Sequence, residues 1–299
     1  MIEVDLHLHT TFSDGTLTPS EMVRLCSSRG LKIISITDHD STEGIPDALR
    51  AAQAFPELTV IPGIELSTDI PGAEIHILGY YVDCNDSGFQ QVIHGFREGR
   101  RERARDIVKR LAELSVHVSW ERVQELSDGG AVGRPHIAQA MVESGYVKYP
   151  KEAFDVYLGR NGTAYVGRPK LRPKDAVELL VRSGALPVMA HPTYAVPSGV
   201  DDPITSLRET LQELQVSGLV GIEVYYRDYT QEQIAELVVL ADQLGVISCG
   251  GSDYHASGNP DEPEPGDVGP PMATVEALTE LLSIQSFEEN SFHSPTSDL

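Results

Sequence analysis

The chain has 299 residues, of which 23 are Lys or Arg and 45 are Asp or Glu, so its formal net charge is −22. A hydrophobic share of 40% and a charged share of 23% are typical of a folded globular protein and not of a disordered chain. The acidic balance argues against a protein that coats duplex DNA through bulk electrostatics, although a local cationic site remains possible.

Short apolar runs rich in β-branched residues alternate with amphipathic stretches. The runs predict buried strands at Ile2–Leu8, Ile33–Ile36, Thr59–Glu65, Glu74–Tyr80, Leu186–Ala190, Val220–Val224 and Val246–Cys249. The stretches predict helices at Pro19–Ser28, Asp175–Ser183, Pro203–Gln215 and Gln231–Leu244. Thr18, with Glu21 three residues later, forms a candidate capping box before the first helix. This alternation predicts an α/β protein with a parallel sheet or barrel of about seven strands.

The strand signal stops between about Ser87 and Val166. Helical patterns occupy this segment at Phe89–Leu114, Ser119–Leu126, Pro135–Ser144 and Lys151–Leu158. We therefore expect a discontinuous barrel from residues 1–86 and 166–285, and a helical insertion at 87–165. The Ser-rich and acidic residues 286–299 predict a mobile tail.

Nothing in the sequence suggests a membrane protein. No apolar run approaches the roughly 20 residues that a membrane span needs, and Met1–Asp5 lacks the regions of a signal peptide. The three cysteines, Cys26, Cys84 and Cys249, are far apart and form no CxxC pair. We expect a protein of the reducing cytoplasm that binds no membrane, with its oligomeric state left open.

Six of the ten histidines lie in clusters at predicted strand ends. The clusters are Asp5-Leu6-His7-Leu8-His9 followed by Ser13-Asp14-Gly15, Thr37-Asp38-His39-Asp40, Gly63-Ile64-Glu65 followed by His76, Ala190-His191-Pro192, and Ser252-Asp253-Tyr254-His255. Residues i and i+2 of a strand face the same side, so His7 and His9 project together. Since the C-terminal ends of parallel barrel strands open on one face, we expect these clusters to converge.

A set of six His, two Asp and one Glu exceeds what one tetrahedral ion needs. It predicts two or three divalent cations with mixed nitrogen and oxygen ligation, and Glu65 is the candidate bridging carboxylate. A single His at a strand end is usually a hydrogen-bonded surface residue. Five such clusters are harder to explain as packing, because imidazoles and carboxylates are costly to bury together without metal.

These motifs resemble, in their order, those of the PHP family (polymerase and histidinol phosphatase). The stretches Asp5–Pro19 and Gly133-Arg134-Pro135-His136 resemble that family as well. The resemblance extends from Ile2 to about Leu282 and is strongest to stand-alone nucleotide phosphatases and 5′-to-3′ oligoribonucleases. It implies a distorted (β/α)7 barrel with an inserted helical subdomain.

The resemblance also implies three metal sites. The first comprises His7, His9, Glu65 and Asp253; the second shares Glu65 and adds His76 and His191; the third comprises Asp14, His39 and His255. Asp14 stands where some relatives have histidine, which makes the third site the least certain to be filled. Mn²⁺ is the expected metal, and this ligation also permits Fe²⁺ or Zn²⁺.

The implied activity is hydrolysis of phosphate esters on nucleotides by a metal-activated hydroxide. The expected substrates are 5′-mononucleotides, 3′,5′-bisphosphate nucleotides or the 5′ ends of short RNA. Asp38 or His39 is the candidate general acid or base, and the sequence does not choose between them.

Four residues are candidates for binding the substrate phosphate. Arg134 opens a predicted helix, where an anion is favoured, although it could instead pin the insertion through a salt bridge. His136 could contact phosphate or cap the helix. Arg168 and Lys170 precede the second half of the barrel, and for both a solvated loop charge is the simpler interpretation.

Phe96–Leu114 is unusually basic for an acidic protein. It carries seven cationic residues, Arg97, Arg100, Arg101, Arg103, Arg105, Lys109 and Arg110. Acidic residues four positions away favour a salt-bridged, solvated face. The functional alternative is an electrostatic track for a nucleotide or short RNA.

Three other functions remain open. Histidinol phosphate phosphatase activity needs the same chemistry on a different substrate. An amidohydrolase that cleaves C–N bonds uses similar ligands, but no lysine is placed as a carbamylated bridge. A degenerate metal-binding module would have lost ligands, whereas all nine expected positions carry competent residues.

Overall fold

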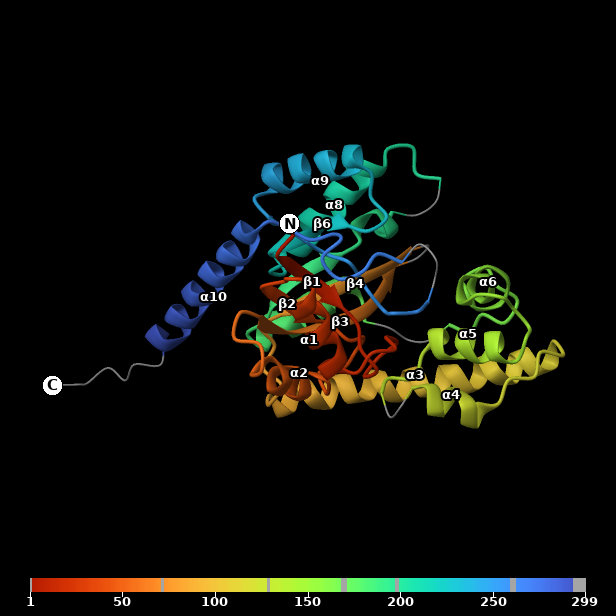
Figure 1. Ribbon diagram of the computed structural model, residues 1–299. Coiled ribbons are helices and arrows are strands. Elements are labelled where there is room, and N and C mark those ends of the chain that lie inside the picture. Colours follow the sequence, from red (N-terminus) through yellow and green to blue (C-terminus); the bar gives the residue numbers. More distant parts are fainter. Residues whose placement is uncertain are drawn as a thin grey trace.

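The computed structural model describes residues 2–70, 73–127, 130–167, 171–196, 199–258 and 262–292. Within them, one sheet of seven strands runs in sequential order, with β1 Val4–Leu8, β2 Ile33–Ile36, β3 Thr59–Ile70, β4 Ala73–Tyr80, β5 Leu186–Ala190, β6 Gly221–Tyr226 and β7 Ile247–Gly251. Its two edges meet just beyond β7, where the Asp253 N–H donates to His7 O at 2.9 Å and the His9 N–H donates to Tyr254 O at 3.0 Å. The sheet is therefore nearly closed into a barrel (Figure 1).

The sheet is mixed, so the expectation of a wholly parallel arrangement is wrong. Strand β4 is antiparallel to both β3 and β5, whereas the other strand pairs are parallel. Parallel strands need a crossover of a dozen or more residues, but only two residues separate Ile70 from Ala73. That short connection permits only an antiparallel pair.

Helices cover the outside of the barrel. They are α1 Pro19–Ser28, α2 Ile45–Ala52, α7 Pro173–Arg182, α8 Pro203–Val216 and α9 Gln231–Leu244, with a 3₁₀ turn at Pro192–Ala195. The capping box of Thr18 and Glu21 is confirmed at the start of α1. No helix in these described ranges is long and apolar enough to cross a membrane.

The side chains of β4 alternate between the inside and the outside of the barrel. On β4, Ile75 and Ile77 pack outward against the cluster that includes α7 and α8, whereas Leu78 packs inward with Val188 and Cys249. His76 has the same inward direction as Leu78, one step nearer the open end. Apolar residues therefore fill the lower barrel and polar ones its mouth.

Helix α10, Met272–Phe292, was not expected from the sequence. Its residues Val275 and Leu278 are buried against the barrel core, and the helix then projects away from the body (Figure 1). It continues to Phe292, beyond residue 286, where the sequence predicts the start of a tail. Residues 293–299 lie outside the described residues.

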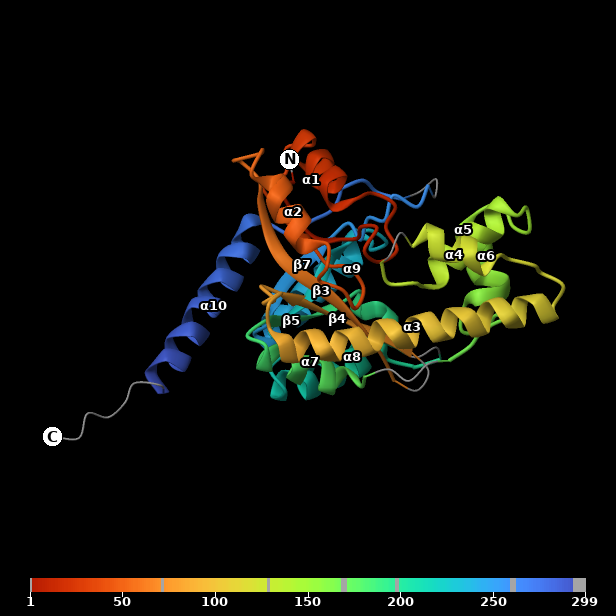
Figure 2. The same ribbon diagram turned by 90° about the horizontal axis from the view of Figure 1, so that it is seen from below.

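The segment after β4 holds four further helices, α3 Ser87–Glu113, α4 Trp120–Leu126, α5 Arg134–Glu143 and α6 Pro150–Ala153, which continues as a π-helical turn at Phe154–Leu158. We call α3–α6 with this turn the insertion helices. Figure 2 shows α3 running under the barrel and beyond it to α4–α6. Ile107, Leu111 and Ile137 belong to a separate apolar core formed by these helices. The division at 87 and 165 remains an interpretation of that arrangement.

Candidate metal centre

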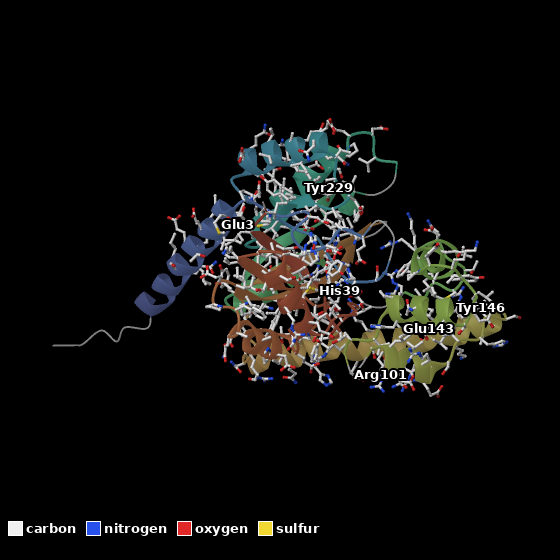
Figure 3. The ribbon with its side chains drawn as sticks, in the orientation of Figure 1. Glu3, His39, Arg101, Glu143, Tyr146 and Tyr229 are labelled. Atoms are coloured by element: carbon white, nitrogen blue, oxygen red, sulfur yellow. The ribbon has the colours of Figure 1, made fainter. Side chains whose placement is uncertain are left out.

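Nine side chains meet at the open end of the barrel, and we call them the His–carboxylate cluster. They are His7, His9, Asp14, His39, Glu65, His76, His191, Asp253 and His255. All come from strands or from segments that follow strands, in agreement with the expected convergence. Figure 3 shows His39 on the side of the barrel that faces the insertion helices, where Glu143 and Tyr146 lie.

The antiparallel direction of β4 explains how His76 joins the others. Because β4 runs opposite to its neighbours, its first half lies at the end where β3 and β5 finish. His76 is paired with Ser67 of β3 and with Ala190 of β5, the residue before His191. His76 therefore reaches the cluster from the start of its strand and not from a C-terminal end.

Glu65 is at the centre of the cluster. Its Oε1 lies 2.7 Å from His76 Nδ1 and 3.2 Å from His191 Nε2. Its Oε2 lies 2.9 Å from His39 Nδ1, 3.2 Å from His9 Nε2 and 3.4 Å from His7 Nε2. Each oxygen thus faces a different group of imidazoles, as a carboxylate that bridges two cations would.

The two aspartates extend the cluster on either side of His9. Asp253 Oδ1 lies 3.1 Å from His9 Nε2 and 3.3 Å from His7 Nε2, while Asp253 Oδ2 accepts a 2.9 Å hydrogen bond from the Tyr226 hydroxyl. Asp14 Oδ1 lies 3.5 Å from His9 Nδ1 and 3.3 Å from His255 Nε2. Tyr226 thereby holds Asp253 Oδ2, and Asp253 Oδ1 faces the cluster.

Three sets of potential ligand atoms lie within 4.8 Å of one another. They are His7, His9 and Glu65; His39, Glu65 and His76; and His9, Asp14, His39 and His255. In the sites implied by the family resemblance, Glu65 is the shared ligand. In the structure, His9 and His39 also belong to two sets each. His191 and Asp253 border the sets through their contacts with Glu65 and His7.

The unsatisfied polar atoms of the cluster fit bound cations. Among the described residues, Glu65 Oε2, Asp14 Oδ1 and His39 Nδ1 are buried and make no hydrogen bond of acceptable geometry. Buried polar groups are normally hydrogen-bonded, so such atoms require an explanation. Nitrogen and carboxylate donor atoms gathered within 4.8 Å of one another are the arrangement that divalent cations need.

Protonation within the cluster follows from burial and neighbouring charges. Burial would raise the pKa of Glu65, but nearby imidazoles, led by His39 and His76, hold it well below its usual range. Burial lowers the pKa of His76 to about 4, which leaves a neutral ring with a free lone pair. Burial opposes protonation of His9, yet Asp253 and Glu65 raise its pKa to about 10.

The two candidate acid–base residues differ in their surroundings. Asp38 is 1% exposed and accepts hydrogen bonds from Thr10 N–H at 2.7 Å, from the Thr10 hydroxyl at 2.6 Å and from the Ser13 hydroxyl at 2.6 Å. Burial raises the pKa of Asp38 despite these bonds. The hydrogen bonds from Thr10 and Ser13 tie Asp38 to the loop between His9 and Asp14, whereas His39 lines two neighbouring cavities.

A cavity of about 200 Å³ lies between the cluster and the insertion helices. Asp14, His39 and His76 line it from the barrel, and Arg100 and Arg134 line it from α3 and α5. Arg134 is the first residue of α5, and its guanidinium lies 5.6 Å above the Phe154 ring. The predicted helix start thus brings a cation to the edge of the cluster.

The other phosphate candidates have different outcomes. His136 is 6% exposed, and its Nδ1 accepts a 3.0 Å hydrogen bond from the Gly133 N–H, so it caps α5. Burial lowers the pKa of His136. A phosphate contact by His136 remains a prediction. Arg168 and Lys170 lie outside the described residues.

The cluster also opens into a second cavity of about 350 Å³, lined by Tyr194 and Tyr226 beside its histidines. Tyr194 is 49% exposed, and its ring centroid lies 5.4 Å from that of His191. Its hydroxyl donates to Asp228 at 2.9 Å. An aromatic face is therefore held at the rim of the cluster.

Two residues close to the cluster were missed at the level of sequence. Arg100 was only one of seven cationic residues in its segment, yet its Nε lies 2.5 Å from Asp40 Oδ2 and it also donates to Ser67. Glu223 is buried on β6 and contacts His7. The available signal for Glu223 was a lone acid inside an apolar run that predicts a buried strand.

Comparison with known proteins agrees with this geometry. The model of the PHP domain matches residues 5–157, which hold six members of the cluster, and this match covers half of the chain. The chain belongs to the PHP family. Its nearly closed seven-stranded barrel is consequently the PHP fold.

Curated PHP relatives match nearly the whole chain. It is 30% identical over 259 residues to a 3′,5′-nucleoside bisphosphate phosphatase of Chromobacterium violaceum, covering 86% of this chain and 89% of the relative. It is 32% identical over 252 residues to the 5′-3′ exoribonuclease Rnm of Salmonella typhimurium, covering 84% of both. A solved structure from Bifidobacterium adolescentis, described as a metal-dependent phosphoesterase, has a TM-score of 0.83 and 27% identity, with 92% and 94% of the two chains covered.

Proposed function

We propose that this PHP protein is a metal-dependent phosphoesterase that hydrolyses phosphate esters of nucleotides. The observation that carries the proposal is the position of the His–carboxylate cluster, which borders a cavity lined by Arg100 and Arg134. Cation ligands on one wall and guanidinium groups on the other suit a phosphate group bound between them.

The cluster would hold two or three divalent cations. Glu65 belongs to two of the three ligand sets and would bridge two ions, while Asp14, His39 and His255 would contribute to the third. When bound, such cations supply a water activated near neutral pH and neutralise the charge of the phosphoryl oxygens. Mixed imidazole and carboxylate ligation permits Mn²⁺, Fe²⁺ or Zn²⁺, and of these we expect Mn²⁺.

The protein's own groups bind and orient the substrate. Arg134 would pair with phosphate oxygens from the start of α5, where helix N–H groups favour an anion. Arg100 adds positive charge to the same cavity while its Nε holds Asp40. His39 lines both cavities, and it would act as the acid–base group only while it holds no cation; the oxygens of Asp38, the other candidate, accept hydrogen bonds from Thr10 and Ser13.

A nucleotide is the substrate class that the site and the relatives support together. The exposed Tyr194 ring at the rim provides a surface on which a base or a ribose can lie. The curated relatives named above act on a nucleoside bisphosphate and on RNA. The three free thiols, Cys26, Cys84 and Cys249, support a location in the reducing cytoplasm.

A substrate panel tests the proposal. Protein reconstituted with Mn²⁺ is given AMP, 3′-phosphoadenosine 5′-phosphate, short 5′-phosphorylated RNA, histidinol phosphate and an N-acyl amino acid. We expect phosphate or nucleotide release from one of the first three, and its loss after treatment with a chelator. Cleavage of histidinol phosphate or of the N-acyl amino acid alone would overturn the nucleotide assignment.

A further inference from the structure

Glu223 is a buried acid of the barrel interior that the proposed function leaves without a role. It lies on β6 between Ile222 and Val224, which pack outward in the apolar core, and its side chain is fully buried. A carboxylate at such a position costs several kcal/mol unless hydrogen bonds compensate its charge. Its partners therefore indicate why the barrel keeps an acid there.

Both oxygens of Glu223 contact cluster histidines. Oε1 lies 3.0 Å from His7 Nδ1, and the His7 side chain is equally buried. Oε2 accepts a 2.8 Å hydrogen bond from the backbone N–H of His191. One carboxylate thus joins β1 to the segment that follows β5, beneath the proposed metal sites.

We propose that Glu223 is a positioning residue that holds His7 and His191 in the geometry needed to bind cations. This inference rests on the proposed function, since it concerns the same metal centre. An ionised carboxylate only accepts hydrogen bonds, so His7 Nδ1 carries the proton. The lone pair of His7 Nε2 then points into the cluster, 3.3 Å from Asp253 Oδ1 and 3.4 Å from Glu65 Oε2.

The contact with His191 acts through the backbone. His191 has φ 30° and ψ 60°, a left-handed conformation that is strained for a residue with a side chain. Glu223 Oε2 holds the N–H of this turn, and the His191 side chain extends from it to Glu65 Oε1. Glu223 consequently fixes the tautomer of His7 and the backbone turn from which the His191 side chain extends.

Outer hydrogen bonds of this kind tune metal affinity. The partner of a histidine ligand fixes the ring's tautomer and orientation, and its loss commonly weakens metal binding by roughly 10–100-fold. Glu223 meets this description for His7 because the two groups face each other in an interior that excludes water. Its effect should therefore appear in metal binding itself, before any reaction is measured.

The experiment replaces Glu223 with Gln and measures Mn²⁺ binding to the metal-free protein by calorimetry. The amide oxygen of Glu223→Gln accepts from only one of the two histidines, and its NH₂ group faces the other as a donor. We expect Mn²⁺ affinity to fall about 10–100-fold. In the Zn²⁺-loaded protein, ¹⁵N spectra should show the Nδ1–H signal of His7 in the wild type and its loss or displacement in the variant.

Tyr80→Phe is the matched control. Tyr80 is fully buried in the barrel core, its hydroxyl has no hydrogen-bond partner among the described residues, and removing that oxygen leaves the cluster contacts intact. We expect Mn²⁺ affinity and the His7 signal to match those of the wild type. A control that weakens binding as much as Glu223→Gln would overturn the specific role of Glu223.

The outcomes separate this inference from the proposed function. A wild-type protein that binds no divalent cation overturns both. A wild type that binds Mn²⁺, together with a Glu223→Gln variant of unchanged affinity and unchanged His7 signal, overturns this inference alone. If glutamine prevents folding, Glu223→Asp provides the measurement: we expect the His7 Nδ1–H signal to remain with a smaller loss of affinity, and wild-type affinity without that signal overturns the inference.

Discussion

The barrel mouth and the insertion helices face the same cavity, but they hold their functional side chains differently. At the mouth, Glu65 is 1% exposed and is surrounded by imidazoles from separate strands. On the insertion side, Arg134 projects from the first residue of α5 over a single aromatic ring. The cluster is thus fixed by closure of the sheet, whereas the cationic wall depends on how the helices are attached.

Among the described residues, polar contacts near the cavity make part of that attachment. Arg100 of α3 pairs with Asp40, Arg97 pairs with Glu43 at 2.9 Å, and the Ala131 N–H donates to Phe12 O at 3.0 Å. The insertion helices also have an apolar core of their own. We therefore expect changes in the cluster to abolish catalysis, and changes in the insertion helices to act mainly on substrate binding.

The largest effect should follow the Glu65→Gln substitution. The amide keeps the shape of the side chain but offers one acceptor atom where the cluster has two, so the bridging position is lost. Metal ions supply several kcal/mol of charge stabilisation in the transition state, so kcat/KM should fall on the order of 10³-fold. Steady-state hydrolysis and metal content by mass spectrometry measure the effect.

Glu57→Gln provides the control for that substitution. Its side chain is 84% exposed, and the same chemical change should leave activity and metal content unaltered. A Glu65→Gln protein that keeps activity within about tenfold of the wild type and binds the full set of ions would contradict the bridging role.

A smaller effect, on stability and on substrate binding together, is expected for Arg100→Met. Asp40 is 1% exposed and keeps a hydrogen bond from the Ser67 N–H, but removing its cationic partner from a buried ion pair typically costs 3–5 kcal/mol, taken here as about 3. The free energy of unfolding in urea should fall by that amount and KM should rise. Methionine preserves the apolar volume of the arginine stem.

The double variant Asp40→Asn with Arg100→Met sharpens this test. Neutralising Asp40 removes the uncompensated charge, so much of the lost stability should return while KM stays high. If the double variant is no more stable than Arg100→Met, the ion pair with Asp40 is not what attaches α3 to the barrel.

Most of the fold was accessible from the sequence because its signals are local. The seven strands and helices such as Pro19–Ser28 were predicted within a few residues, since apolar periodicity and capping residues act within each segment. The direction of β4 was not predicted, although the short link after Ile70 contained the information. Helix α10 was missed, although among its described side chains Val275 and Leu278 are buried against the body and Leu281 and Leu282 pack beside them.

The cluster was accessible for a different reason. Its members have chemically distinctive side chains at strand ends, and family motifs placed them in order. Residues that act through them carry no such mark. Glu223 matters because β6 brings it beside His7 of β1 and the backbone of His191, and Arg100 matters because α3 brings it to Asp40. Pairings between distant segments decide their roles, and a single sequence does not display those pairings.

The smallest of the expected effects is that of Arg134→Ala, which tests whether Arg134 binds the substrate phosphate. A hydrogen bond to a charged group contributes about 1.5–3 kcal/mol, so kcat/KM should fall roughly 10–100-fold, mostly through KM. Arg122→Ala is the matched control, because Arg122 pairs with Glu143 on the outside of the same helices, away from the cavity. Steady-state kinetics on AMP measure both variants.

If both substitutions lower kcat/KM equally, the loss reflects disturbed insertion helices and not a phosphate contact. If Arg134→Ala leaves kcat/KM unchanged, Arg134 does not bind the phosphate, and the cationic wall of the cavity consists of Arg100 and Arg103.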